Sequence, residues 1–259
     1  MPRFKSRRSY LLALACTSLF STVSVVQSAQ AQTPPTLQPG VISFADSGEY
    51  PPMEFMANGK LVGYDIDMGN ELARRMGLKP DWVIVQYTGI VGTLKSKRTD
   101  LIISSFTITP QRQEQVSFSD PYLDADIAAA VRKPDAGLTA AQVGPNDIIG
   151  VQLGTSGAAW ARAHFPSGAN IKVYDDLNLA LKDLAAGRVK LVVNNVPALK
   201  YQSKQLKDLV VTSGWEKFSV GIGARKDDPV MVAALNKTLA AMKADGFMKQ
   251  LDTKWFGAQ

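Results

Sequence analysis

The chain has 259 residues, of which 46% are hydrophobic and 20% charged, a composition typical of a globular protein. Its formal net charge is +6, but residues 1–31 hold four basic and no acidic residues, so the rest of the chain carries 25 basic and 23 acidic residues. Such a mixed, nearly neutral chain excludes a nucleic-acid footprint. No apolar run beyond residue 31 approaches the ~20 residues that span a bilayer.

The first 31 residues have the pattern of a secretory signal peptide. Basic residues at positions 3–8 precede an apolar stretch at 10–26, and Ala29-Gln30-Ala31 gives a small-x-small cleavage pattern. We expect cleavage after Ala31 and export to the periplasm, through either the general or the twin-arginine pathway. The only cysteine, Cys16, lies within this segment and fits a lipid-anchor motif poorly, so the mature chain has no thiol chemistry.

Hydrophobic periodicity predicts strands that alternate with helices along the rest of the chain. Such alternation favours an α/β fold with parallel sheets and helices on both faces. The expected strands are residues 41–45, 82–85, 101–103, 148–153, 171–174, 191–193 and 220–224. The expected helices run from Gly63 to Gly77, from a Thr88 cap through Leu94, over 158–165, from an Asp175 or Asp176 cap to Gly187, from Asp228-Pro229 to Gly246, and through Met248, Leu251 and Trp255.

Two segments of the chain resemble each other. Residues 94–105 and 184–195 each end a helix in a basic turn, feed a three-residue apolar strand and leave polar residues at its exit. This echo suggests two related lobes. If the lobes face each other, Ser104 and Ser105 would line one wall of a cleft and Asn194 and Asn195 the opposite wall.

The stretch 100–122 carries the chain's strongest ligand-binding pattern. Ser104, Ser105 and Thr107 follow an apolar strand, and Arg112 comes shortly after them. In an open α/β sheet, ligands bind outside the carboxyl ends of the strands. A guanidinium fork with nearby hydroxyls suits a carboxylate. The alternative is a solvated Ser/Thr loop that leads into a helix.

Three other features favour the same kind of site. The turn at Gly154, Thr155 and Ser156 lies between a strand and a helix start, where backbone N–H groups attract anions. Its alternative is a plain N-cap. Tyr50 and Tyr87 flank turns in the first lobe and could stack on a ligand, although each is equally well a core or rim tyrosine.

Signals for catalysis are missing from the sequence. His164 is the only histidine, and no spacing of His, Cys and carboxylate residues suits a metal. The turn at 154–157 is not a nucleophile elbow, and the glycines at 221 and 223 do not form a dinucleotide fingerprint. We therefore expect neither a cofactor nor an enzyme.

Taken together, these residues resemble the periplasmic solute-binding proteins of polar amino-acid ATP-binding cassette (ABC) transporters, bacterial extracellular solute-binding protein family 3. The resemblance covers 40–257 and implies a two-lobed Venus-flytrap fold of type II with a two-segment hinge. It places lobe 1 at 40–125 plus 220–259 and lobe 2 at 126–219. The matching motifs are YPPMEF at 50–55, GYDID at 63–67, TITPQR at 107–112, FSDPY at 118–122, GTS at 154–156 and KWFG at 254–257.

The resemblance also assigns ligand-binding roles. It implies that Arg112 binds the ligand α-carboxylate with Thr107, Thr155 and Ser156. Ser105, next to Ser104, would help to hold the α-ammonium, and Tyr50 and Tyr87 would sandwich the ligand.

One position departs from the family pattern. Where typical members have a carboxylate for the α-ammonium, this chain has Asn195, which lacks the charge that strengthens such a hydrogen bond. Asp46 is displaced by one residue relative to Tyr50. We therefore expect an amino-acid-like ligand whose amine is absent, substituted or weakly held.

The resemblance implies an inner-membrane permease as partner, a monomeric state and a role in transport. Two alternatives stay open. Some relatives look like dehydratases with a pocket carboxylate as general acid, a role that Glu49, Asp46 or another carboxylate of the cleft would have to take. The protein could also present its ligand to a signalling receptor, since the same closed surface serves both roles.

Overall fold

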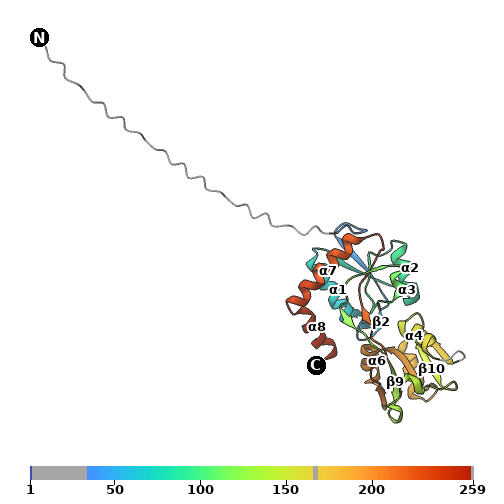
Figure 1. Cartoon of the computed structure of the whole chain (residues 1–259). Coiled ribbons are helices and arrows are strands. Elements are labelled where there is room, and N and C mark those ends of the chain that lie inside the picture. The colour runs from blue at the N-terminus through green and yellow to red at the C-terminus, as the bar shows by residue number, and fades with distance from the viewer. Residues whose placement is uncertain (2–33, 166–168, 258–259) are drawn as a thin grey trace. The chain divides into compact units, whose positions relative to one another are not determined.

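The computed structural model describes Met1 and residues 34–165 and 169–257, so the predicted signal peptide with Cys16 lies outside the described residues apart from Met1. The described chain is built on two five-stranded sheets with helices against them (Figure 1). We call each sheet with its helices a lobe. None of the described helices has both the length and the apolar character needed to cross a membrane.

Sheet 1 has the strand order β5-β1-β6-β15-β7. The first three strands are parallel, and β15 is antiparallel to both of its neighbours. Its strands are β1 (Val41–Asp46), β5 (Lys79–Ile84), β6 (Leu101–Ile102), β7 (Ser117–Phe118) and β15 (Gly223–Ala224).

Sheet 2 has the order β11-β10-β12-β9-β13 and repeats this scheme. Strand β10 lies between two parallel neighbours, as β1 does in sheet 1, and β9 is antiparallel to β12. Strands β6 and β12 therefore hold equivalent places, as the echo between 94–105 and 184–195 predicts. The strands are β9 (Ile127–Arg132), β10 (Ile148–Gln152), β11 (Asn170–Tyr174), β12 (Leu191–Asn195) and β13 (Leu209–Val211).

Two smaller sheets complete the strand pairing. A three-stranded sheet consists of β2 (Glu49–Tyr50), β3 (Glu54–Ala57) and β4 (Lys60–Val62). The strands β8 (Leu123–Asp124) and β14 (Ser219–Val220) pair antiparallel in the two chain segments that connect sheet 1 with sheet 2.

The helices of lobe 1 cover both faces of sheet 1. Ile42 and Phe44 of β1 pack with the apolar sides of α1 and α7, whereas Ala45 points to the opposite face and packs with α2. Fully burying each large apolar side chain contributes about 1.5–3 kcal/mol. The helices are α1 (Tyr64–Arg75), α2 (Ile90–Lys95), α3 (Pro110–Gln113), α7 (Pro229–Ala244) and α8 (Phe247–Phe256), with the 3-10 turn η1 (Tyr87–Gly89) before α2.

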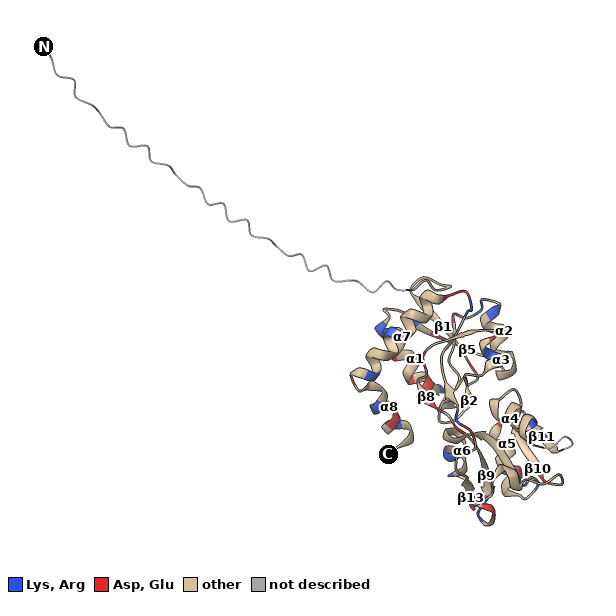
Figure 2. Cartoon of the chain, viewed as in Figure 1, with Lys and Arg blue, Asp and Glu red and all other residues tan. Residues whose placement is uncertain are grey.

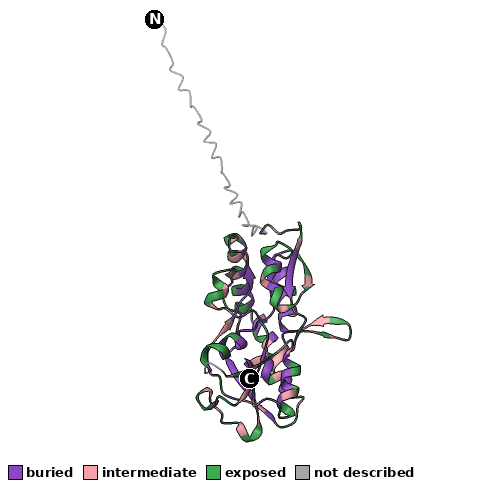
Figure 3. Ribbon diagram, turned by 90° about the vertical axis from the view of Figure 1, so that its right-hand side faces the viewer, coloured by how far each residue is buried: buried purple, intermediate pink, exposed green. Residues whose placement is uncertain are grey.

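Lobe 2 follows the same rule. Along β9, Ala128 and Ala130 face α5 and α6, and Ala129 and Val131 face α4. Buried residues accordingly concentrate along the strands, shown in purple in Figure 3.

Basic residues lie on the outer helices, among them α7 and α8 (Figure 2). The helical segments are α4 (Ser156–His164), α5 (Leu177–Ala185), α6 (Val196–Ser203), η2 (Lys133–Asp135) and η3 (Ala140–Gln142).

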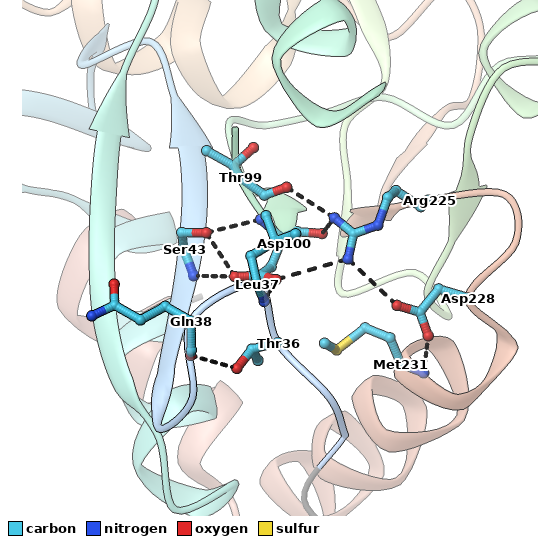
Figure 4. Close-up of polar contacts among 9 residues, drawn as sticks. All are labelled: Thr36, Leu37, Gln38, Ser43, Thr99, Asp100, Arg225, Asp228 and Met231. Atoms are coloured by element: carbon cyan, nitrogen blue, oxygen red, sulfur yellow. Dashed lines mark hydrogen bonds and ion pairs between the residues drawn. The ribbon is translucent and has the colours of Figure 1, made fainter. Parts of the chain in front are cut away.

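The buried carboxylate of Asp100, directly before β6, links several segments of lobe 1 (Figure 4). Asp100 accepts hydrogen bonds from the amide of Leu37 at 2.8 Å and from the amide and hydroxyl of Ser43 at 2.9 and 2.7 Å. The guanidinium of Arg225 lies 3.8 Å from Asp100 and 3.6 Å from Asp228, which caps α7. This network joins β1, the start of β6 and the N-terminus of α7.

Several sequence-based expectations about the elements were wrong. Thr88 does not cap α2; it lies in η1, and the N-cap residue is Gly89 without a side-chain hydrogen bond. The expected strand 220–224 divides into β14 and β15, which pair in different sheets. The sheets are mixed rather than parallel, because β15 and β9 enter them directly from the connecting segments without a helical crossover. The expected cap of α5, by contrast, is confirmed: of the two residues predicted for it, Asp175 and Asp176, it is Asp176.

Candidate functional site

A cavity lies where the strand exits of the two sheets meet. Its volume is about 20 Å³, room for one or two water molecules. Its walls are hydroxyl, amide and tyrosine side chains, and none of the residues that line it carries a formal charge. The lining residues are Ser47, Tyr50, Tyr87, Ser104, Ser105 and Thr107 from lobe 1 and Gln152, Thr155, Ser156, Asn194 and Asn195 from lobe 2.

The two lobes hydrogen-bond directly to each other across this cavity. The hydroxyl of Tyr50 donates to Oδ1 of Asn194 at 2.8 Å, and both side chains are buried. The hydroxyls of Thr107 and Ser156 are 3.0 Å apart, and that of Ser156 also donates to Oδ1 of Asn195 at 3.3 Å. The opposed walls are therefore complementary in donors and acceptors.

On the lobe 2 side, the N-terminus of α4 is packed against the exit of β12. Gly157 permits this approach, because a Cβ there would lie 2.9 Å from the Cα of Asn194 and from the carbonyl oxygen of Val193. The hydroxyl of Thr155 accepts from the amide of Ala158 and donates to the carbonyl of Gln152. Thr155 thus acts as an N-cap, and Ser156 is the hydroxyl of this turn that bonds across the cavity.

Arg112 lies beside the cavity and does not line it. Its guanidinium donates to the carbonyl of Thr107 at 2.9 Å, to the hydroxyl of Tyr87 at 2.9 Å and across the lobes to the carbonyl of Gly154 at 3.3 Å. It also stacks over the ring of Phe106 at 4.3 Å. These contacts hold a cation at the rim, where both lobes meet.

Behind the lobe 1 wall lie three buried carboxyl groups, Asp46, Glu54 and Asp65, each fully inaccessible to solvent. Burial raises the pKa of Asp46 and of Glu54 well above their usual values, and neighbouring carboxylates raise both further. Burial raises the pKa of Asp65 to about 7, although hydrogen bonds from Ser105 and Tyr122 counteract the increase. Among the described residues, no group of three such side chains is placed to hold a metal ion.

Asp65 fixes the loop that carries the lobe 1 hydroxyls. The backbone of Ser105 adopts the left-handed conformation, with φ of 46°, which is unusual for a residue other than glycine. Its amide donates to Oδ2 of Asp65 at 2.5 Å, and Tyr122 donates to Oδ1 at 2.9 Å. The buried carboxylate therefore holds the strained turn next to the cavity.

The structure brings together most of the residues that the sequence singled out. Ser104, Ser105, Thr107, Tyr50, Tyr87, Thr155, Ser156 and Asn195 line one cavity, together with Asn194. Arg112 borders it, and Asp46 lies behind its wall, where its Oδ1 accepts from the amide of Gly48 at 2.7 Å.

Sequence reasoning missed Ser47, Gln152 and the carboxyl groups of Glu54 and Asp65. Gln152 could have been found, because it ends β10 beside β12 as a polar strand exit. Glu54 and Asp65 belong to motifs that the sequence displays, but nothing local to either motif indicates that the two side chains meet.

Comparison with known proteins gives the context of this cavity. The family model for bacterial extracellular solute-binding proteins, family 3, matches residues 42–258. The lysine/arginine/ornithine-binding periplasmic protein of Escherichia coli (strain K12) is 33% identical over 251 residues, which cover 92% of this chain and 94% of the relative. The octopine-binding periplasmic protein of Rhizobium meliloti is 31% identical, and the match covers 95% of this chain and 97% of that relative.

A solved structure agrees with these relatives. The ancestral amino acid-binding protein AncCDT-1, described as a precursor of cyclohexadienyl dehydratase, superposes with a TM-score of 0.79 at 31% identity, covering 84% of this chain and 96% of that one. The expected two-lobed α/β fold is therefore confirmed. The chain belongs to the bacterial extracellular solute-binding proteins of family 3.

Proposed function

We propose that this protein is the substrate-binding component of an ABC importer and that it binds an amino acid, or an N-substituted amino-acid derivative, in the cavity between its lobes. One observation carries the proposal: the two walls hydrogen-bond directly across the cavity through Tyr50–Asn194 and Thr107–Ser156. A ligand inserted there replaces these bonds with its own and touches both lobes, so its binding energy favours the closed form.

Arg112 is proposed to bind the ligand carboxylate. A guanidinium has five N–H donors, and in Arg112 both donors of Nη2 point to the hydroxyl of Tyr87 and across the lobes to the carbonyl of Gly154. A carboxylate that binds two N–H groups of Arg112 would replace one of these two partners. The first turn of α4, with Ser156, adds backbone N–H groups that have no intrahelical partner.

The ligand nitrogen is proposed to face the neutral Asn195. Its amide oxygen already accepts from Ser156, and its amide nitrogen lies 3.5 Å from the hydroxyl of Thr107, a long hydrogen bond. An amide oxygen holds an ammonium less strongly than a carboxylate does. A relative that is named for octopine, an arginine derivative substituted on its α-nitrogen, fits this preference.

We further propose that the protein binds its ligand without converting it. Relatives named for ligand binding support this role. A dehydratase would need a general acid in contact with the ligand, and Glu54, the acid behind the wall, has its Oε1 occupied by Ser47 and Ser104. The family supports an inner-membrane permease as partner. A monomeric state, removal of residues 1–31 and lobe boundaries at 126 and 219 belong to the same proposal.

Ligand-dependent thermal stabilisation of the refolded protein tests the proposal, because a ligand that selects the native state raises the melting temperature. The panel pairs L-arginine with octopine and with des-amino arginine, and L-glutamine with its N-acetyl derivative. We expect stabilisation by carboxylates and no advantage of the free α-amine. The variant Asn195→Asp should restore a preference for the free amine. A protein that no panel member stabilises, or one that strictly requires a free amine, contradicts the proposal.

A further inference from the structure

Glu54 contacts two of the cavity-lining serines from behind. The hydroxyl of Ser104 donates to Oε1 of Glu54 at 2.7 Å, and the hydroxyl of Ser47 donates to the same oxygen at 3.1 Å. A serine hydroxyl has one hydrogen. Once both hydrogens point toward Glu54, each serine oxygen has only lone pairs left for the cavity, and that of Ser104 also accepts from the amide of Ser47 at 3.2 Å.

The other oxygen of Glu54 has a different environment. Oε2 is buried and receives no hydrogen bond from any described residue. A hydrogen bond from Glu54 lowers the pKa of Asp65, which also accepts from Ser105 and Tyr122. Asp65 thus has a donor at each of its two oxygens, as an ionised carboxylate does, whereas both donors to Glu54 point to Oε1. Two buried carboxylates this close do not both ionise, so one of them keeps a proton.

We propose that Glu54 holds this proton on Oε2 and donates it to Asp65, so that its Oε1 accepts from Ser47 and Ser104 and turns both hydroxyls into acceptors toward the cavity. Glu54 is then a positioning residue that acts on the ligand through two serines. The lobe 1 wall is specific for ligand groups that present N–H or O–H donors. This inference rests on the proposed ligand cavity and names one determinant of its selectivity.

The charged and titratable surroundings of Glu54 agree with this assignment. Asp46, at the end of β1, and Asp65, in α1, both oppose a second negative charge and raise the pKa of Glu54 after burial has done so. Burial raises the pKa of Tyr50 and of Tyr87, and a negative charge on Glu54 would raise both further, so these phenols stay neutral. No cation is among the groups that shift the pKa of Glu54 in the described chain.

Two variants of Glu54 distinguish a role in hydrogen bonding to the serines from a role of a negative charge at this position. Glu54→Gln reproduces the proposed state, because its amide oxygen accepts from the serines and its N–H replaces the O–H toward Asp65. Glu54→Met keeps the volume but frees both hydroxyls. Asp100→Asn is the matched control, since Asp100 is another buried carboxylate of lobe 1, and none of its partners Leu37, Ser43 and Arg225 lines the cavity.

The first readout requires no ligand. The full chain, labelled with ¹³C at the glutamate side-chain carboxyl carbons, is followed by NMR as the pH is raised, and the Glu54 signal is identified by its loss in Glu54→Gln. We expect that signal at the position of a protonated acid at neutral pH, and unchanged in Asp100→Asn. A Glu54 signal at the ionised position overturns the inference, whatever the protein binds.

The second readout is the dissociation constant for L-arginine, which has N–H donors at both ends. We expect Glu54→Gln to bind within about threefold of wild type and Glu54→Met to bind roughly tenfold or more weakly, the effect of losing one or two hydrogen bonds. Equal weakening in Glu54→Gln and Glu54→Met would mean that the charge matters, which contradicts the inference. A wild-type protein that ignores L-arginine counts against the proposed ligand class, and the NMR titration then decides on Glu54 by itself.

Discussion

Replacing Arg112 with lysine keeps one positive charge at the rim of the cavity and removes the planar fork. The fork makes three hydrogen bonds, one of which crosses from lobe 1 to the carbonyl of Gly154 in lobe 2. An ammonium is a compact charge on a flexible stem, so it cannot hold these carbonyl and hydroxyl partners and a carboxylate in one plane.

The size of the effect follows from these contacts. A hydrogen bond to a charged group contributes about 1.5–3 kcal/mol, and lysine retains part of the attraction to the ligand carboxylate. We expect Arg112→Lys to weaken binding by about 2–3 kcal/mol, roughly 30- to 150-fold in the dissociation constant. Because Arg112 is only half-buried and α3 is short, the melting temperature of the ligand-free protein should change little.

Isothermal titration calorimetry with the most strongly stabilising member of the ligand panel measures this loss. Arg132→Lys is the matched control, because Arg132 also donates to two carbonyls, of Leu184 at 2.9 Å and Val189 at 3.0 Å, but lies away from the cavity. The control should retain wild-type affinity. Unchanged affinity in Arg112→Lys would refute the assignment of Arg112 to the carboxylate.

Three further predictions concern stability and closure. Folding stability, measured by urea unfolding, should fall between about pH 5 and pH 8. Folding raises the pKa of Asp65 from 3.8 to about 7, so the stability that this group contributes is fully present below 3.8 and is lost as the pH rises through 7. A rise in stability over this range would contradict the prediction. Tyr50→Phe loses the hydroxyl bound to Asn194 and about 1 kcal/mol of closed-state stability, so small-angle X-ray scattering of the ligand-free protein should show a larger radius of gyration than wild type. Gly157→Ala should cost about 1–3 kcal/mol in urea unfolding, because its Cβ would meet backbone of β12 at 2.9 Å, whereas Gly92→Ala, with nothing within 4 Å, should not.

The sequence was a good guide to elements whose pattern is local. The apolar spacing and the Asp228 cap predicted α7, and the terminating Gly187 and Asp176 predicted α5. The pattern failed where pairing with distant strands decides the structure. Helix α6 and strand β13 were not predicted, and the single expected strand at 220–224 divides because its two halves pair with β8 and with β6 and β7.

In the site, too, residues with a local sequence signal were predicted, and residues placed by distant contacts were not. Ser104 and Ser105 could be found because they follow a short apolar strand, and Asn195 because it ends one; strand exits gather at one edge of a sheet. The contacts of Glu54 with Ser47 and Ser104 could not, because only the tertiary fold brings β3 next to the residues that follow β1 and β6. A lone acidic residue in a turn-rich segment is usually solvated, so no local signal marked Glu54 as buried.

The most direct test of the account is a crystal structure of the protein with the compound that stabilises it most. The account predicts the ligand between the two sheets, with its carboxylate on Arg112 and its other end against Ser47 and Ser104, and with the direct Tyr50–Asn194 and Thr107–Ser156 contacts replaced by bonds to the ligand. A ligand bound elsewhere, or one in the cavity with its carboxylate turned away from Arg112, would contradict it.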